Sequence, residues 1–366
     1  MVKYLKIFFG ILIILLLSVL GLINLGFINS SDYFIPNKNL DDIHIGVVQS
    51  TQNDNIGYIS FYDKSFNFKY EKKLEFGDMG DSTRVPYLSD DNFYTVPLGI
   101  GNRKDLKTIV KFDLKTGKYK TFKINQPAVL MFTVNKNDVY TTNTINFDGY
   151  ISKCDTITGS LQEWKKHGVI ISGLKCYDDI LYAWGTLNEN NIDNPYLFVF
   201  ETKELKMIKQ IPLKECGTQQ LDSYKIGDYI YFTNNLDTKG SDSSKTLSKF
   251  NIITNEIQNI ELRETNPFQI IEHNNKLYIT HCNPLTANKN KITVFDPKTG
   301  NQQLFEMKNP LVQTIKYKNY LYSQDMHNLY VYNLNTLELL KSININKERK
   351  SSLIPKHFYI GGMFVK

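Results

Sequence analysis

Residues 275–307 read NKLYITHCNPLTANKNKITVFDPKTGNQQLFEM, and versions of this unit recur along the chain. A short apolar strand, Leu277–Ile279, leads into a polar loop. A second strand, Ile292–Phe295, runs into Asp296 and the turn Pro297–Gly300. Asp side chains close tight turns, and Gly tolerates a positive φ, so the pattern D-x-x-T-G predicts a hairpin into a further strand.

The residue that closes the middle strand of this unit recurs about every 45 residues, which is the period of a propeller blade. It is acidic or an amide each time: Asp63, Asp113, Asp155, Glu201, Asn251, Asp296 and Asn333. An apolar residue followed by tyrosine precedes the last six middle strands, at Tyr94, Tyr140, Tyr182, Tyr231, Tyr278 and Tyr322. Helical solenoids share this period, but no unit shows their 3.6-residue apolar spacing.

The two ends of the repeat region complement each other. The first unit lacks its innermost strand, and a strand-like segment, residues 357–366, follows the seventh unit with no blade to join. We therefore predict an all-β, seven-bladed propeller of four-stranded antiparallel blades, closed by the C-terminal strand beside residues 43–50. The predicted blades are 43–76 with 357–366, then 82–124, 126–166, 168–213, 217–262, 266–307 and 309–345.

Two segments resemble known propeller repeats. Residues 154–164, CDTITGSLQEW, resemble the D-x-x-T-G docking motif, with its later Trp, of quinoprotein-like (PQQ-type) repeats. Residues 329–345 resemble the YVTN-type repeat of surface and periplasmic propellers. The resemblance implies a propeller over residues 43–366. The adjacent cysteine pair of quinoprotein dehydrogenases is missing, so we expect no quinone and no other cofactor.

The N-terminal segment differs from the rest of the chain. Lys3 and Lys6 precede an apolar run at residues 7–28, and about 20 apolar residues suffice for a membrane-spanning helix. Lysines on the short N-terminal side favour a cytoplasmic N-terminus, which puts the remainder on the extracytoplasmic side of the cell membrane. We predict a single-pass anchor at 1–30, a linker at 31–42 and the propeller at 43–366. A cleaved signal peptide is the alternative.

Charge and cysteine content exclude some classes of function. The chain carries 43 basic and 37 acidic side chains, a balance that indicates no nucleic-acid partner. None of the four cysteines, Cys154, Cys176, Cys216 and Cys282, forms a C-x-x-C motif, and we favour buried free thiols over disulfides or metal ligation. We interpret His273 and His281 as surface or capping residues.

The candidate ligand site is the mouth of the central channel, where the residues entering the inner strands are expected to form a ring. That ring is Arg84, Gln126, His167, Gln219, Asn266, Asn309 and His357. It has no carboxylate, so it suits a neutral polar or anionic group and not a metal such as Ca²⁺. Four predicted loop insertions lie on the same face, at residues 97–107, 185–195, 234–246 and 282–291.

The sequence favours a membrane-anchored extracytoplasmic propeller that acts as a binding or protein-interaction module for a protein, a glycan or a small polar or anionic ligand. Two alternatives stay open. One is an anchored enzyme, either a hydrolase or a quinoprotein-like protein, although sialidase-type Asp boxes and a G-x-S-x-G nucleophile motif are missing. The other is a scaffold subunit of an envelope assembly.

Overall fold

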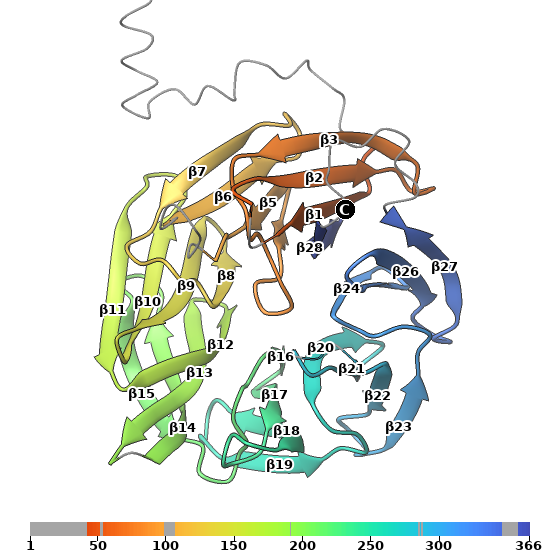
Figure 1. The fold of residues 1–366 in the computed structure, drawn as a ribbon. Helices are drawn as coiled ribbons and strands as arrows, with labels where there is room; N and C mark the ends of the chain where they lie inside the picture. Colours follow the sequence, from red (N-terminus) through yellow and green to blue (C-terminus); the bar gives the residue numbers. More distant parts are fainter. Residues whose placement is uncertain are drawn as a thin grey trace, which may run out of the picture.

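The computed structural model describes residues 42–51, 54–98, 107–190, 192–284, 286, 288–345 and 358–366. These residues form seven four-stranded antiparallel sheets arranged as blades around a central opening (Figure 1). The prediction of an all-β, seven-bladed propeller is therefore confirmed.

The blades are numbered here in ring order, and the strands of each are given from the channel outward. Blade 1 consists of β28 (Tyr359–Val365), β1 (Ile45–Ser50), β2 (Gly57–Tyr62) and β3 (Phe68–Leu74). Blade 2 consists of β4 (Tyr87–Ser89), β5 (Asn92–Thr95), β6 (Thr108–Asp113) and β7 (Tyr119–Lys123). Blade 3 consists of β8 (Met131–Asn135), β9 (Asp138–Ile145), β10 (Asp148–Asp155) and β11 (Leu161–His167).

Blades 4 to 7 repeat the same order along the chain. Blade 4 consists of β12 (Val169–Tyr177), β13 (Ile180–Glu189), β14 (Ile192–Glu201) and β15 (Lys206–Pro212). Blade 5 consists of β16 (Ser223–Ile226), β17 (Tyr229–Leu236), β18 (Ser243–Asn251) and β19 (Ile257–Glu261). Blade 6 consists of β20 (Pro267–His273), β21 (Lys276–His281), β22 (Lys291–Phe295) and β23 (Gln302–Glu306), and blade 7 of β24 (Gln313–Tyr317), β25 (Tyr320–Gln324), β26 (Asn328–Asn333) and β27 (Leu339–Asn344).

The hydrophobic core lies between neighbouring blades. Phe61 of blade 1 and Phe112 of blade 2 have ring centroids 5.5 Å apart. Trp184 of blade 4 and Phe232 of blade 5 are 5.7 Å apart in the same way. Because each sheet is covered on both faces by its neighbours, large aromatic side chains fill these interfaces.

The D-x-x-T-G segments form the turns that their residues predict. In three of them the glycine adopts a positive φ, and its N–H donates to the backbone carbonyl of the aspartate, as for Gly159 and Asp155 at 2.8 Å. The aspartate carboxylate accepts further backbone N–H groups, for example that of Ile157 at 2.7 Å. The turns between the third and fourth strands of these blades are therefore fixed by local chemistry alone.

Ring closure is confirmed in the expected place. β28 pairs antiparallel with β1, from Ile45 opposite Val365 to Ser50 opposite Tyr359. The C-terminal strand thus becomes the innermost strand of a blade whose other strands come from the start of the propeller (Figure 1).

One of the predicted loop insertions is not a simple loop. Residues 185–195 lie almost wholly in an extended β13–β14 hairpin, in which Asn188 is opposite Asp193 and Glu189 is opposite Ile192. The two strands continue to pair where we expected a loop, with exposed side chains at Asn188, Glu189, Ile192 and Asp193. Of the predicted insertion at 97–107, only residues 97, 98 and 107 are among the described residues.

The predicted anchor and all but one residue of the predicted linker lie outside the described residues. Within the part of the chain that the structure describes, no helix is long and apolar enough to cross a membrane.

Candidate functional site: the central channel

The loop between β3 and β4, residues 75–86, reaches into the central opening and appears there as an orange segment in Figure 1. Asp81 holds its shape, because its Oδ1 accepts the backbone N–H groups of Thr83 and Arg84, both at 2.7 Å. The Arg84 guanidinium lies 2.8 Å from Asp81 Oδ2 and 3.4 Å from Asp78 Oδ1. This loop therefore carries its own charge compensation.

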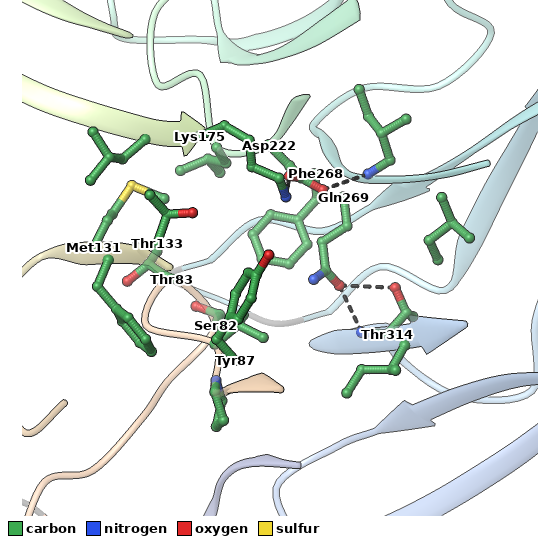
Figure 2. Close-up of a pocket in the computed structure, with 18 residues that line it drawn as sticks. Ser82, Thr83, Tyr87, Met131, Thr133, Lys175, Asp222, Phe268, Gln269 and Thr314 are labelled. Atoms are coloured by element: carbon green, nitrogen blue, oxygen red, sulfur yellow. Dashed lines mark hydrogen bonds and ion pairs between the residues drawn. The ribbon is translucent and has the colours of Figure 1, made fainter. Parts of the chain in front are cut away.

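A cavity of about 260 Å³ occupies the channel beside this loop (Figure 2). Its walls combine hydroxyl, amide and charged groups with aliphatic and aromatic side chains from blades 2 to 7. The lining residues that the argument uses are Ser82, Tyr87, Met131, Thr133, Lys175, Asp222, Phe268, Gln269 and Thr314. Pockets of this mixed composition, enclosed by a rigid scaffold, are typical of ligand sites.

An ion pair crosses one wall of the cavity. Lys175 Nζ of β12 lies 3.1 Å from Asp222 Oδ1, just before β16. The second carboxylate oxygen of Asp222 accepts the backbone N–H of Ile270, in β20, at 2.9 Å. The negative charge of Asp222 raises the pKa of Lys175 above its ordinary value, so the ammonium group stays protonated at neutral pH.

Gln269 connects blade 6 to blade 7 through hydrogen bonds. Gln269 Oε1 accepts two bonds from Thr314 in β24, one from its backbone N–H at 2.7 Å and one from its hydroxyl at 2.9 Å. A backbone N–H can only donate, so the accepting atom must be the oxygen. Figure 2 shows the amide nitrogen of Gln269 on the side of Tyr87, facing the cavity.

Three members of the predicted ring have buried side chains with structural partners. Arg84 is held by Asp81 and Asp78, as described above. Asn266 Nδ2 donates to the backbone oxygen of Asn235 at 3.1 Å. Asn309 Nδ2 donates to Ser323 Oγ at 3.2 Å.

The other members of the predicted ring lie apart from one another. Gln126 is half-buried five residues before β8, and Gln219 is exposed with a φ of 54°. His167 ends β11, the outermost strand of blade 3, with 82% of its side chain exposed and Nδ1 2.8 Å from Asp148. His357 lies outside the described residues.

The cavity is therefore lined by residues other than the six described members of the predicted ring. One physical reason is the uneven length of the connections from an outer to the next inner strand. Gly168 alone joins β11 to β12, whereas residues 75–86 join β3 to β4. Unlike the predicted ring, the cavity wall contains a carboxylate, that of Asp222.

A sequence signal for the cavity residues exists. The inner-strand residues opposite the recurrent tyrosines include Tyr87, Thr133 and Lys175. Asp222 and Gln269 stand two residues before such a partner, in blades 5 and 6. These positions can be found by starting at the recurrent tyrosine in the second strand and following the hairpin back to its partner in the inner strand. Our prediction started instead from the residue that enters the inner strand, and it missed them.

The two histidines interpreted as surface or capping residues are buried. His273 Nε2 lies 2.8 Å from Asn335 Oδ1, and His281 lies 2.9 Å from the Thr265 carbonyl and 2.8 Å from Thr293 Oγ1. Burial lowers the pKa of His281 to about 4. Among the described residues, no group of three or more His, Cys, Asp or Glu side chains could hold a metal ion.

The four cysteines are free thiols. Cys154, Cys216 and Cys282 are buried, as expected, and Cys176 is half-buried. Burial raises the pKa of each thiol, for example to about 11 at Cys154, so none is a thiolate at neutral pH.

Comparison with known proteins identifies the fold only. No family model and no curated protein matches the chain. Among solved structures, the chain is similar to the dihydro-heme d1 dehydrogenase NirN in complex with DHE. The sequence identity is 12% and the TM-score is 0.52, and the match covers 86% of this chain and 78% of that chain.

Two further structures show the same likeness. A 6-phosphogluconolactonase-like protein from Bacteroides uniformis has 13% identity and a TM-score of 0.60, with 83% of this chain and 97% of that chain covered. A functionally unknown protein from Desulfotomaculum acetoxidans has 11% identity and a TM-score of 0.56, with 83% and 95% covered. At these identities the likeness shows a β-propeller and carries no activity to this chain.

Proposed function

We propose that this protein is a membrane-anchored extracytoplasmic propeller that works as a binding module and holds its ligand in the central channel. The carrying observation is the channel cavity of about 260 Å³, in which polar side chains from several blades converge between apolar walls. Such a site gives orientation through its polar groups and affinity through its apolar ones.

The point where the chain enters the propeller fits this proposal. Asp42 and Ile43 lie beside Tyr317, the last residue of β24, and Lys366, which follows β28. These residues mark the end of the inner strands, whereas the loop at 75–86 leads into the start of β4. An anchor preceding Asp42 would hold the propeller by the face at which the inner strands end. The opposite face, which carries the loop at residues 75–86, would then point away from the membrane.

The enzyme alternative receives less support from the cavity. Its ionisable lining residues are Tyr87, Lys175 and Asp222. The raised pKa of Lys175 keeps its amine protonated, which makes it a hydrogen-bond donor and a poor base or nucleophile at neutral pH. The scaffold alternative predicts that cavity substitutions leave the protein's interactions unchanged, which distinguishes it from a binding module.

A thermal-shift screen of the full-length chain in detergent tests the binding role. A ligand that binds the folded state raises the melting temperature. We expect such a shift to disappear in Lys175→Met and to persist in Lys225→Met, whose lysine pairs with Asp178 at 2.6 Å outside the cavity. A shift that survives Lys175→Met unchanged would remove the channel as the binding site.

Protease accessibility tests the location. In intact cells of the native host, added protease should cleave the propeller without lysis. Protection until the membrane is opened would contradict the extracytoplasmic location. N-terminal sequencing of the mature protein distinguishes the anchor from a cleaved signal peptide, because a mature start near residue 30 would show cleavage.

A further inference from the structure

The amide oxygen of Gln269 and the carboxylate oxygens of Asp222, in the cavity wall, already accept hydrogen bonds from the protein itself. Gln269 Oε1 already accepts two bonds from Thr314. The two oxygens of Asp222 accept from Lys175 and from the backbone N–H of Ile270. The amide and carboxylate oxygens of this wall therefore already hold donors of the protein, and hydroxyl oxygens are the other side-chain acceptors that a ligand meets there.

Donors in the same wall are left over. The Gln269 amide nitrogen has no partner among the described residues, and one bond from Lys175 to Asp222 leaves its ammonium group with spare N–H groups. The hydroxyls of Ser82, Tyr87 and Thr133 likewise have no partner among the described residues. Lys175 keeps 35% of its side-chain surface accessible, so a ligand in the cavity can contact this side chain.

Both positive charges in and beside the cavity, on Lys175 and Arg84, are compensated by carboxylates. The positive charge of Lys175 is compensated by Asp222 at 3.1 Å. Arg84, in the adjoining loop, is only 1% exposed and is compensated by Asp81. An anion in the cavity would have to compete with Asp222 for Lys175 and leave one negative charge uncompensated, which is costly away from bulk water.

We propose that the channel ligand is a small neutral molecule whose carbonyl or hydroxyl oxygens accept hydrogen bonds from Gln269, Lys175 and the wall hydroxyls. This inference rests on the proposed binding function and narrows its ligand from polar or anionic to neutral and rich in acceptors. Apolar side chains, among them Met131 and Phe268, cover the remaining wall and suit the carbon skeleton of such a molecule. Acetylated sugars and peptide amides carry this chemistry.

Two substitutions isolate the donors without emptying the cavity. Gln269→Glu keeps an oxygen to accept from Thr314 and replaces the amide nitrogen with an acceptor. Thr133→Val removes one hydroxyl at nearly constant shape. Gln258→Glu is the matched control, because Gln258 is exposed on the outermost strand β19 and gains the same charge.

The experiment is ligand-observed NMR on the full-length chain in detergent. The neutral probes are N-acetylglucosamine and N-acetylalaninamide, and the matched anionic probes are N-acetylneuraminic acid and N-acetylalanine, with inorganic phosphate added. We expect binding of a neutral probe, weakened about tenfold by Gln269→Glu and severalfold by Thr133→Val, and unchanged in Gln258→Glu.

Three other results would count against the neutral ligand or against the binding function. If the anionic probes bind in preference and Lys175→Met removes their binding, the channel is a binding site but the neutral-ligand inference is wrong. If a neutral probe binds equally to the original protein and to both cavity variants, the donors do not hold it and the inference is again wrong. If no probe in either class depends on the cavity residues, the proposed binding function fails together with the inference.

Discussion

The two halves of the ring join their inner strands in different ways. From blade 5 to blade 1, a side chain of each inner segment accepts a backbone N–H of the next: Asp222 that of Ile270 at 2.9 Å, Gln269 that of Thr314 at 2.7 Å, and Gln313 that of Met363 at 3.1 Å. We call this the bonded half. The equivalent positions in blades 2, 3 and 4, two residues before the partner of the recurrent tyrosine, are Val85, Met131 and Gly173.

The second half, which we call the packed half, relies on close contact. A Cβ on Gly173 would lie 2.1 Å from the Gln220 carbonyl oxygen, and one on Gly362 would lie 2.2 Å from the Pro86 ring where blades 1 and 2 meet. The comparison teaches that the bonded half fixes the orientation of Gln269, whereas the packed half supplies Tyr87, Met131 and Thr133 as walls. The cavity wall therefore has a side fixed by hydrogen bonds and a side fixed by packing.

Removing the strand that ends the bonded half should have the largest effect. Deleting residues 358–366 removes Ile360, Met363, Phe364 and Val365, all buried. At about 1.5–3 kcal/mol for each side chain the loss is about 6–12 kcal/mol, which is comparable to the whole stability of a domain. We expect loss of cooperative thermal unfolding by circular dichroism. A cooperative transition at an unchanged midpoint would show that β28 does not close the ring.

A point substitution compares the two halves directly. Gln313 is fully buried and both donates to and accepts from the backbone of Met363. Gln313→Leu leaves two backbone groups without partners and should cost about 4 kcal/mol, whereas Met131→Leu, at the equivalent packed position, should cost less than about 1.5 kcal/mol. Urea unfolding measures both. Equal losses would mean that the bonds between inner strands add nothing beyond packing.

Mild acid should weaken the bonded half. His281, at the end of β21, has a pKa lowered to about 4 by burial, against 6.5 for an exposed histidine, with Glu264, Lys289 and Lys291 nearby. Between pH 6.5 and pH 4, His281 is therefore protonated in the unfolded chain and neutral in the folded chain. The free energy of unfolding keeps its full value above pH 6.5 and falls as the pH drops below it. We expect a loss of about 2 kcal/mol between pH 7 and pH 5.

The control for this acid effect is His281→Asn, which should be less stable at neutral pH but lose this part of the pH dependence. The pKa of Asp63 is lowered to about 2, so its contribution to stability is lost only as the pH falls below the ordinary aspartate pKa of 3.8. That change lies outside the range from pH 7 to pH 5. An unchanged slope in His281→Asn would assign the acid effect to another group.

The fold was predictable because its signals are local and repeated. Each D-x-x-T-G turn is determined by its own residues, such as Asp155 and Gly159, and seven copies of the blade unit at a period of about 45 residues leave few alternatives. The closing strand followed from an unpaired edge at one end and a surplus strand at the other.

The site was less predictable because it depends on distances between blades. Whether a residue faces the channel depends on the path of the connection from the outermost strand of one blade to the innermost strand of the next. Gly168 alone makes this connection between β11 and β12, whereas twelve residues, 75–86, make it between β3 and β4. Buried partners such as those of Arg84 and Asn266 belong to segments remote in sequence or to an irregular loop, which no periodicity encodes.

The smallest predicted effect is in the packed half and has the opposite sign. The β9–β10 turn of blade 3 places Asn146 and Phe147 at φ values of 53° and 64°, the geometry that favours Asn-Gly. Phe147 is 78% exposed, so its ring contributes little packing to offset the strain. Phe147→Gly should therefore stabilise the protein by about 1 kcal/mol, which is about 2 °C in melting temperature for a chain of this size.

Asn146→Gly should change the melting temperature less, because asparagine already tolerates this region. The backbone carbonyl of Phe147 accepts from Gly168 N at 2.7 Å, a bond that either residue can make, so the comparison isolates the cost of the side chain. A lower melting temperature in Phe147→Gly would show that the exposed ring stabilises this turn through contacts of its own. A higher one would show that the turn keeps a strained aromatic residue at the expense of stability.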